Sequence, residues 1–265
     1  MNAALIVGVN EVDAGRYGRP MPTLRSAERD AMAMAHFLRD EKRFDTGTPM
    51  LGRMATLDAV VAQLQWAARR LANPNDVFVV YFAGHGSQVP DPTWSEHDGK
   101  NETFCLYDGE LIDHALYVAL AAFRPKVKVL VVTDCCHSGA DELWDSPRKT
   151  LPREVAARTL PRELALDAYR SLAFSCNMQP RLRPGERQRI LSADVELLAA
   201  CRESELAFEG PELGYFTDAL LQVWASHKKL PFAELESRID RKTPNCQTPN
   251  CVLLSRSADF THMPF

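Results

Sequence analysis

The chain has 265 residues, of which 46% are hydrophobic and 25% are charged, and its net charge of −4 predicts a folded protein with no general attraction to nucleic acid or anionic membranes. No segment has the length and apolar character of a transmembrane helix, and no basic segment with a cleavage site marks a signal peptide. The seven cysteines are an odd number in a chain without an export signal, so we expect reduced thiols and a cytoplasmic location.

The first part of the chain alternates apolar runs with amphipathic segments. Strands are predicted at 5–9, 49–53, 77–82 and 127–132, with a short edge strand at 103–107. Helices are predicted at 26–39, 57–71 and 113–123, with Ser26, Thr56 and Asp113 as their N-caps. The runs at 77–82 and 127–132 are apolar along most of their length, which is typical of strands buried on both faces of a parallel sheet.

The segment 141–190 differs in composition from the residues before it. Residues 146–190 carry ten basic and four acidic side chains and have only modest apolar periodicity around 155–172. We interpret 141–190 as a mobile or partly helical connector. Its basic residues allow three interpretations, which are a solvated linker, a segment for autoprocessing and, since aromatic residues are not interleaved, more weakly a nucleic-acid patch. The basic side chains available for autoprocessing include Arg148, Lys149, Arg153, Arg158 and Arg162.

Regular structure is predicted again after the connector. We expect a strand at 195–201, helices at 215–226 and 232–239, and a last strand at 251–254. Because strands and helices alternate, the fold class is α/β, with a mostly parallel sheet of about six strands and helices on both faces. The connector interrupts this alternation without ending it, so residues 1–265 are expected to form one domain built from blocks 1–140 and 191–265.

Two short motifs follow the two most apolar strands. Residues 83–86 read Ala-Gly-His-Gly, and residues 134–139 read Asp-Cys-Cys-His-Ser-Gly. A His and a Cys at the carboxyl ends of neighbouring parallel strands lie where open α/β sheets place their chemistry. The imidazole of His85 can deprotonate a thiol and later protonate a leaving amine. Backbone N–H groups near Gly86 and Cys136 are candidates for an oxyanion hole.

These motifs resemble those of the caspase-like cysteine peptidases, in the metacaspase and bacterial orthocaspase branch. The resemblance also covers 5–10, 24–30 and 96–103, and beyond the connector 197–201 and 214–221, which resemble the small-subunit half of that family. It implies a caspase-like fold and aligns Cys136 with the catalytic cysteine and His85 with its base. Side chains of neighbouring residues in an extended segment point to opposite faces, so Cys135 is expected to be a packed or alternative thiol. His137 abuts Cys136 and is interpreted as structural.

The resemblance also implies a substrate preference. Asp30 and Asp134 match two acidic positions of the metacaspase specificity pocket, where a carboxylate pair attracts an Arg or Lys side chain. Without the resemblance, Asp134 would be interpreted as a strand-end cap and Asp30 as a solvated helix residue. We therefore expect cleavage after Arg or Lys through a thioacyl intermediate, with protein or peptide substrates that contain basic residues as partners.

No cofactor is expected for this chemistry, and calcium is a possible activator. The acidic series could supply oxygen ligands, with Asp98 and Glu102 as the weak candidates, but a solvated acidic loop is the alternative. The full series comprises Glu96, Asp98, Glu102, Asp108, Glu110 and Asp113. The contiguous residues 135–137 lack the spacing of a zinc site.

The resemblance implies an effector in a stress, cell-death or immune pathway. The chain length leaves no room for an attached recruitment domain, so a separately encoded activator is a possible partner, and neither a membrane nor nucleic acid is expected. Two alternatives remain: a catalytically silent caspase-like interaction module, and another thiol hydrolase of related architecture.

Overall fold

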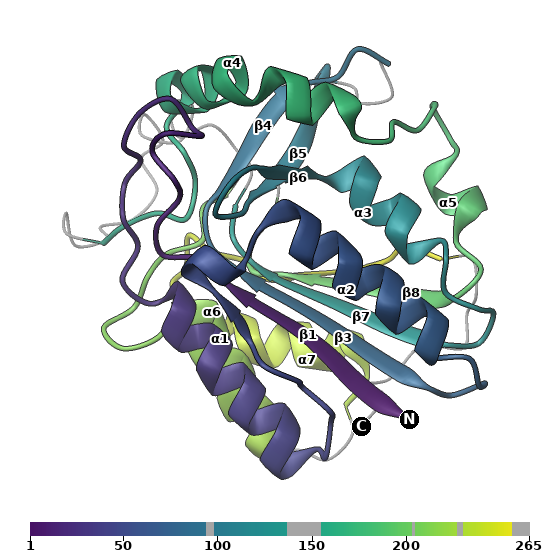
Figure 1. Cartoon of the computed structure of the whole chain (residues 1–265). Coiled ribbons are helices and arrows are strands. Elements are labelled where there is room, and N and C mark those ends of the chain that lie inside the picture. Colours follow the sequence, from purple (N-terminus) through teal and green to yellow (C-terminus); the bar gives the residue numbers. More distant parts are fainter. Residues whose placement is uncertain (94–97, 137–154, 203–204, 227–229, 256–265) are drawn as a thin grey trace.

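The structure is a computed structural model that describes residues 1–93, 98–136, 155–202, 205–226 and 230–255 (Figure 1). Five residues for which the sequence predicted a role lie outside these ranges: Glu96, His137, Arg148, Lys149 and Arg153. Among the described residues, no helix is both long enough and apolar enough to cross a membrane.

A six-stranded sheet in the described residues forms the centre of the fold, in the order β2-β1-β3-β7-β8-β9. All neighbours pair in parallel except β8 and β9. Gly8, Ala83 and Asp134 are aligned across β1, β3 and β7, so the carboxyl ends of these strands meet at one edge. The strands are β1 (Asn2–Gly8), β2 (Met50–Leu51), β3 (Val77–Ala83), β7 (Lys128–Asp134), β8 (Asp194–Ala199) and β9 (Asn250–Leu253).

Helices cover both faces of this sheet, which confirms the predicted fold class (Figure 1). One face packs against α1 (Ala27–His36), α6 (Tyr215–Ser226) and α7 (Phe232–Asp240), and a π-helical turn, Phe37–Glu41, extends α1. The other face packs against α2 (Leu57–Arg70) and α3 (Asp113–Leu120). A 3₁₀ turn, Gly52–Met54, precedes α2, and Thr56 caps that helix as predicted by accepting the Ala59 N–H at 3.3 Å.

A second, antiparallel sheet corrects one expectation. The residues near 103–107 were predicted as an edge strand, but β5 (Lys100–Cys105) is the middle strand of a three-stranded sheet. Its neighbours are β4 (Gly86–Pro90) and β6 (Glu110–Ile112), which are too short and too polar to show a clear period in the sequence.

The connector is more regular than expected. It contains α4 (Arg162–Met178) and the short α5 (Arg187–Ile190). Ala168, Leu172 and Cys176 recur every four residues along α4 and pack against Tyr17 and Cys105 beneath the second sheet. Leu166, Phe174 and Met178 on the same helix are exposed, which weakens the amphipathic pattern and explains why the helix was only partly recognised.

The contact between α1 and β1 depends on Gly8. A Cβ added there would lie 2.6 Å from the Ala31 Cβ and 2.7 Å from the Ala27 carbonyl oxygen. We expect Gly8→Ala to destabilise the fold by about 1–3 kcal/mol, because α1 must shift away from the sheet. Urea unfolding measures this loss. Gly109→Ala is the matched control, since its methyl would make ordinary contacts at 3.7 Å with Leu57, and equal midpoints for the two variants would contradict the prediction.

Candidate active site

His85 lies two residues after the end of β3, and its imidazole is held in one orientation. Its Nε2 is 2.8 Å from the carbonyl oxygen of Pro22. Because that oxygen can only accept, Nε2 carries the proton and Nδ1 has a free lone pair. Burial lowers the pKa of His85 to about 4, and Nδ1 has no hydrogen-bond partner. The ring is therefore neutral near pH 7 and able to accept a proton at Nδ1.

The two adjacent cysteines after β7 face opposite sides of the sheet. Cys136 packs in the apolar cluster beneath α1 and α6, whereas Cys135 packs in the cluster beneath α2 and α3. The Cys136 Sγ lies 3.9 Å from the Ala207 carbonyl oxygen. Burial raises the pKa of Cys135 well above its usual range, so that thiol stays protonated.

Asp30 and Asp134 meet in a fully buried cluster whose third member is Arg158. The Arg158 Nη1 lies 2.8 Å from the Asp134 Oδ2, and its Nη2 forms an ion pair with Asp30. All three side chains are fully buried. The Gly214 N–H donates to Asp30 at 2.8 Å and the Thr217 hydroxyl donates to Asp134 at 2.6 Å. Burial raises the pKa of Asp30 to about 6, although Arg158 opposes this rise.

The backbone carbonyl oxygen of Arg158 accepts hydrogen bonds from two backbone N–H groups of the site. It accepts the Gly86 N–H at 3.0 Å and the Cys136 N–H at 3.2 Å. These are the two backbone groups that the sequence analysis assigned to an oxyanion hole. One residue thus places its side chain between the two predicted specificity carboxylates and its carbonyl between the two predicted oxyanion donors.

The chain on either side of Arg158 is extended and paired like a bound peptide. The Arg158 N–H donates to the Ala207 carbonyl at 2.9 Å, and the Glu209 N–H donates to the Ala156 carbonyl at 3.0 Å. Beyond Arg158, the Leu160 N–H donates to the Gly86 carbonyl at 3.0 Å. This arrangement is β-strand addition, in which backbone bonds hold the segment and pockets receive its side chains. We refer to residues 155–160 as the site-bound segment.

Glu209 and Ser26 position other residues of the site, and the sequence did not predict this role for either of them. The Glu209 carboxylate accepts the backbone N–H groups of Arg25 and Ser26 and the Ser26 hydroxyl, at 2.7–3.0 Å. Ser26 stands at the N-cap position of α1 but makes no side-chain cap, so the predicted capping bond is absent. Its hydroxyl is used by Glu209 and by Arg158 instead, which holds the start of α1, and with it Asp30, against the site.

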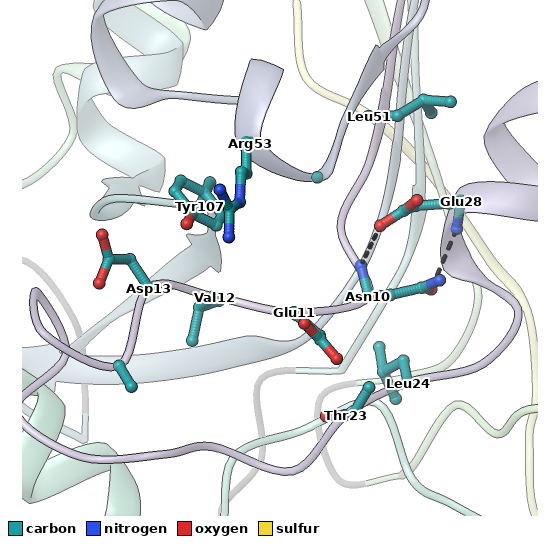
Figure 2. A pocket seen from close by; sticks show the side chains of 12 residues that line it. Asn10, Glu11, Val12, Asp13, Thr23, Leu24, Glu28, Leu51, Arg53 and Tyr107 are labelled. Carbon is teal, nitrogen blue, oxygen red and sulfur yellow. Dashed lines mark hydrogen bonds between the residues drawn. The ribbon is translucent and has the colours of Figure 1, made fainter.

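The loop 10–24, whose Pro22 carbonyl orients His85, also borders a cavity of about 680 Å³ (Figure 2). Two hydrogen bonds between Asn10 and Glu28, at 3.2 and 3.3 Å, tie this loop to α1. Arg53 lies over the ring of Tyr107 on the opposite wall. The cavity is therefore mainly polar and shares its walls with the loop and helix that support the site.

The acidic series does not converge in the described residues. Asp108 accepts the Leu57 N–H at the start of α2, Asp113 pairs with Arg187, and Glu110 is buried against Thr103. Asp98 accepts the Lys100 N–H at 3.1 Å, and Glu102 lies in β5 opposite Gln88. No group of three metal-ligating side chains occurs within the described ranges. Calcium activation through Asp98 and Glu102 stays a prediction.

Comparison with known proteins places the chain in a wider context. Residues 1–261 match the family model of the caspase domain, Peptidase_C14. Metacaspase-1B of Aspergillus terreus is 25% identical over an alignment of 186 residues, which covers 64% of this chain and 46% of that protein. Metacaspase-1A of Aspergillus clavatus is 27% identical over an alignment of 242 residues, which covers 85% of this chain and 52% of that protein. The chain spans about half the length of these two relatives.

Solved structures extend the comparison. A protein of Geobacter sulfurreducens superposes with a TM-score of 0.83 at 31% identity, covering 97% of this chain and 95% of that one. Caspase-1 of Spodoptera frugiperda superposes with a TM-score of 0.55 at 12% identity, covering 96% of this chain and 89% of that one. Because its sequence identity is only 12%, the similarity to this caspase-1 shows a shared fold and nothing more.

Proposed function

Since the chain belongs to the caspase domain family, as the resemblance of its motifs implied, we propose that it is a cysteine endopeptidase that cleaves peptide bonds after arginine or lysine. The observation that carries this proposal is the placement of Arg158. Its guanidinium forms ion pairs with Asp30 and Asp134, and its carbonyl oxygen accepts hydrogen bonds from the N–H groups of Gly86 and Cys136. That is the position that the residue before a scissile bond must take in such a site.

The proposed reaction has two steps. The Cys136 thiol gives its proton to Nδ1 of His85, and its sulfur attacks the carbonyl carbon of the basic residue. The developing oxyanion is stabilised by the Gly86 and Cys136 N–H groups. The imidazolium then protonates the leaving amine, and water hydrolyses the thioacyl intermediate with His85 again as the base. Every proton in these steps moves between groups of the chain, the substrate and water.

Gly214 supports the assignment of the acidic pocket to a long cationic side chain. A Cβ at Gly214 would lie 2.7 Å from the Arg158 Nη2 and 2.7 Å from the Asp134 Oδ2. The pocket therefore uses the missing side chain of this glycine as space for the guanidinium. The planar, bidentate geometry of arginine suits two carboxylates better than the single ammonium of lysine does.

The site-bound segment also supports the autoprocessing interpretation of the connector. Arg158 fills the pocket that we assign to the basic substrate residue, so the bond from Arg158 to Thr159 would correspond to the bond that is cut. We therefore propose Arg158–Thr159 as an intramolecular substrate, with release of residues 155–160 as the step on which a separate activator or calcium would act.

A peptide panel tests the proposed specificity. Four peptides differ only in the residue before the scissile bond, which is Arg, Lys, Asp or citrulline, the uncharged near-isostere of arginine. We expect kcat/KM, measured with and without calcium, to be about 100-fold lower for the citrulline and Asp peptides than for the Arg peptide, because a buried carboxylate would lose its charged partner.

A matched pair of variants controls the panel. Asp134→Asn should lower the ratio of Arg to citrulline turnover, whereas Asp218→Asn, an exposed carboxylate of α6, should leave it unchanged. Turnover of all four peptides at similar rates would favour another kind of thiol hydrolase. Absence of turnover, together with no labelling by an arginine-based electrophile, would favour a catalytically silent interaction module.

A further inference from the structure

A second thiol lies beside the active-site cysteine. Strands β7 and β8 are parallel neighbours in which Thr133 pairs with Ala199, and the Ala200 N–H donates to the Thr133 carbonyl at 2.9 Å. Cys201 is the next residue after Ala200. Its Sγ lies 3.8 Å from the Cys135 carbonyl oxygen, and the neighbouring Cys136 thiol is the largest cause of the raised pKa of Cys201. The two thiols therefore lie close together, in one buried cluster at the carboxyl ends of adjacent strands.

The surroundings of this pair favour a bond between these two sulfurs over other cysteine pairs. Cys136 and Cys201 belong to the same apolar cluster, whereas Cys135 points into the cluster on the other face of the sheet. If the register of Thr133 opposite Ala199 continues, Cys201 is level with Cys135 and one residue short of Cys136. Because adjacent parallel strands lie about 4.8 Å apart, this offset still leaves the Cα atoms of Cys136 and Cys201 within the range that a disulfide spans. A bond between Cys135 and Cys136 would instead require one of two oppositely directed side chains to turn through the sheet.

We propose that Cys136 and Cys201 form a reversible disulfide when a peroxide oxidises the active-site thiol. The Cys136 thiolate attacks one oxygen of hydrogen peroxide, so that an S–O bond forms, the O–O bond breaks and hydroxide leaves as water. The Cys201 sulfur then attacks the Cys136 sulfur, so that the S–S bond forms and the S–O bond breaks. The Cys201 proton leaves with this hydroxide as a second water. Two thiols are oxidised and one peroxide is reduced by two electrons.

The two thiols have different roles in this step. The contact with Cys136 and burial raise the pKa of Cys201 well above its usual range, so Cys201 stays protonated and reacts slowly with peroxide. It serves as the resolving thiol, because it already lies against the sulfur that is oxidised. The disulfide removes the nucleophile and shields Cys136 from irreversible oxidation to the sulfinic acid. The inference rests on the proposed function only in treating Cys136 as the reactive thiol.

The site-bound segment also determines when the Cys136 sulfur can react with peroxide. While residues 155–160 occupy the site, Cys136 is only 1% exposed. Peroxide therefore reaches its sulfur mainly when the segment has left. Oxidation is therefore expected to be slower in the self-occupied chain than in the open enzyme.

Peptide mass spectrometry tests the disulfide directly and without an activity assay. Reduced protein is treated with hydrogen peroxide, quenched with catalase, alkylated and digested with trypsin under non-reducing conditions. We expect a linked pair of the tryptic peptides 129–148 and 190–202, which dithiothreitol separates. The same link is expected in Cys135→Ser, which excludes the neighbouring thiol. A Cys135–Cys136 link, or a sulfinic acid on Cys136 without the linked pair, would overturn the inference.

Activity after oxidation supplies the second measurement. Peptidase activity of the wild type should fall with peroxide and largely return with dithiothreitol. In Cys201→Ser the returned fraction should be about tenfold lower, because Cys136 proceeds to the sulfinic acid. Cys251→Ser, which changes a thiol packed near α7, should behave like the wild type. A linked pair in a protein that cleaves no peptide would contradict the proposed function and leave the disulfide standing.

Discussion

Cys136→Ala is expected to abolish peptide cleavage, with kcat/KM for the Arg peptide reduced by about 10⁴-fold or more. The substitution removes the sulfur that attacks the carbonyl carbon and leaves the Cys136 backbone N–H in place. Because Arg158 and its ion pairs are untouched, the variant should fold and keep the site-bound segment. Initial rates and the intact mass of the purified chain measure both effects, and no cleavage after Arg158 should occur.

Cys135→Ala is the matched control for this loss. The two cysteines are adjacent, but Cys135 packs on the other face of the sheet with a thiol that burial keeps protonated. We expect this variant to keep most of the activity, with some loss of stability from the small cavity. Full activity of Cys136→Ala, or an equal loss in both variants, would show that the nucleophile is assigned wrongly.

The sequence signals that located His85 and Cys136 are local ones. Each residue follows a run of buried β-branched residues, and β3 and β7 are neighbours in the sheet with Ala83 opposite Asp134. A strand end can be recognised without knowledge of the rest of the chain, and parallel strands bring their carboxyl ends to one edge. Cys201 had the same signal, since it ends the predicted strand 195–201. Its position beside Cys136 followed only once β8 was known to lie next to β7.

The residues that complete the site have no such signal. Arg158 was one of several basic residues in the connector, and its selection depends on backbone pairing with residues 207–209, about fifty positions later. Ser26 resembled an ordinary cap because a cap is a local choice, and its use by Glu209 and Arg158 is decided by long-range packing. The Glu209 carboxylate binds the backbone N–H groups of Arg25 and Ser26, and Pro22 acts through its carbonyl oxygen, so neither contact can be predicted from residue types alone.

Whether local sequence preference agrees with long-range packing also explains which secondary-structure elements were predicted correctly and which were not. Thr56 caps α2 and the apolar strands form as predicted, because local preference and tertiary packing agree there. The strands β4 and β6 depend on their pairing with β5, and α4 depends on burial of only three side chains beneath the second sheet. Such elements are stabilised by partners distant in sequence, which a pattern within one segment cannot show.

Arg158→Ala is expected to open the site. The variant removes the guanidinium that holds the site-bound segment on two buried carboxylates, a loss of about 2–5 kcal/mol of binding for the segment. A tethered segment competes at a high effective concentration, so weakening it should raise the initial rate on an added Arg peptide by about 30-fold or more. Labelling of Cys136 by an arginine-based electrophile should accelerate equally, and the bond from residue 158 to Thr159 should no longer be cut.

The matched controls for this variant are Arg162→Ala and Arg158→Lys. Arg162 is an exposed basic residue of the same connector, so its removal should leave the rate and the cleavage at Arg158 unchanged. Arg158→Lys keeps a charge but not the two-carboxylate geometry, and should give an intermediate rate. A rate that rises equally in Arg158→Ala and Arg162→Ala would mean that the connector, rather than the residue in the pocket, limits access.

The stability of Arg158→Ala should depend on pH in a direction that identifies the carboxylate pair. Burial already raises the pKa of Asp30 to about 6 despite the opposing Arg158, and removing that cation raises the pKa further. A carboxyl group whose pKa is higher in the folded state binds its proton there first, so stability falls as pH rises through that pKa. The loss relative to the wild type should therefore be greater at pH 8 than at pH 5.5, and urea unfolding at both values measures it. An equal loss at the two pH values would show that Asp30 and Asp134 do not share the pocket that Arg158 vacates.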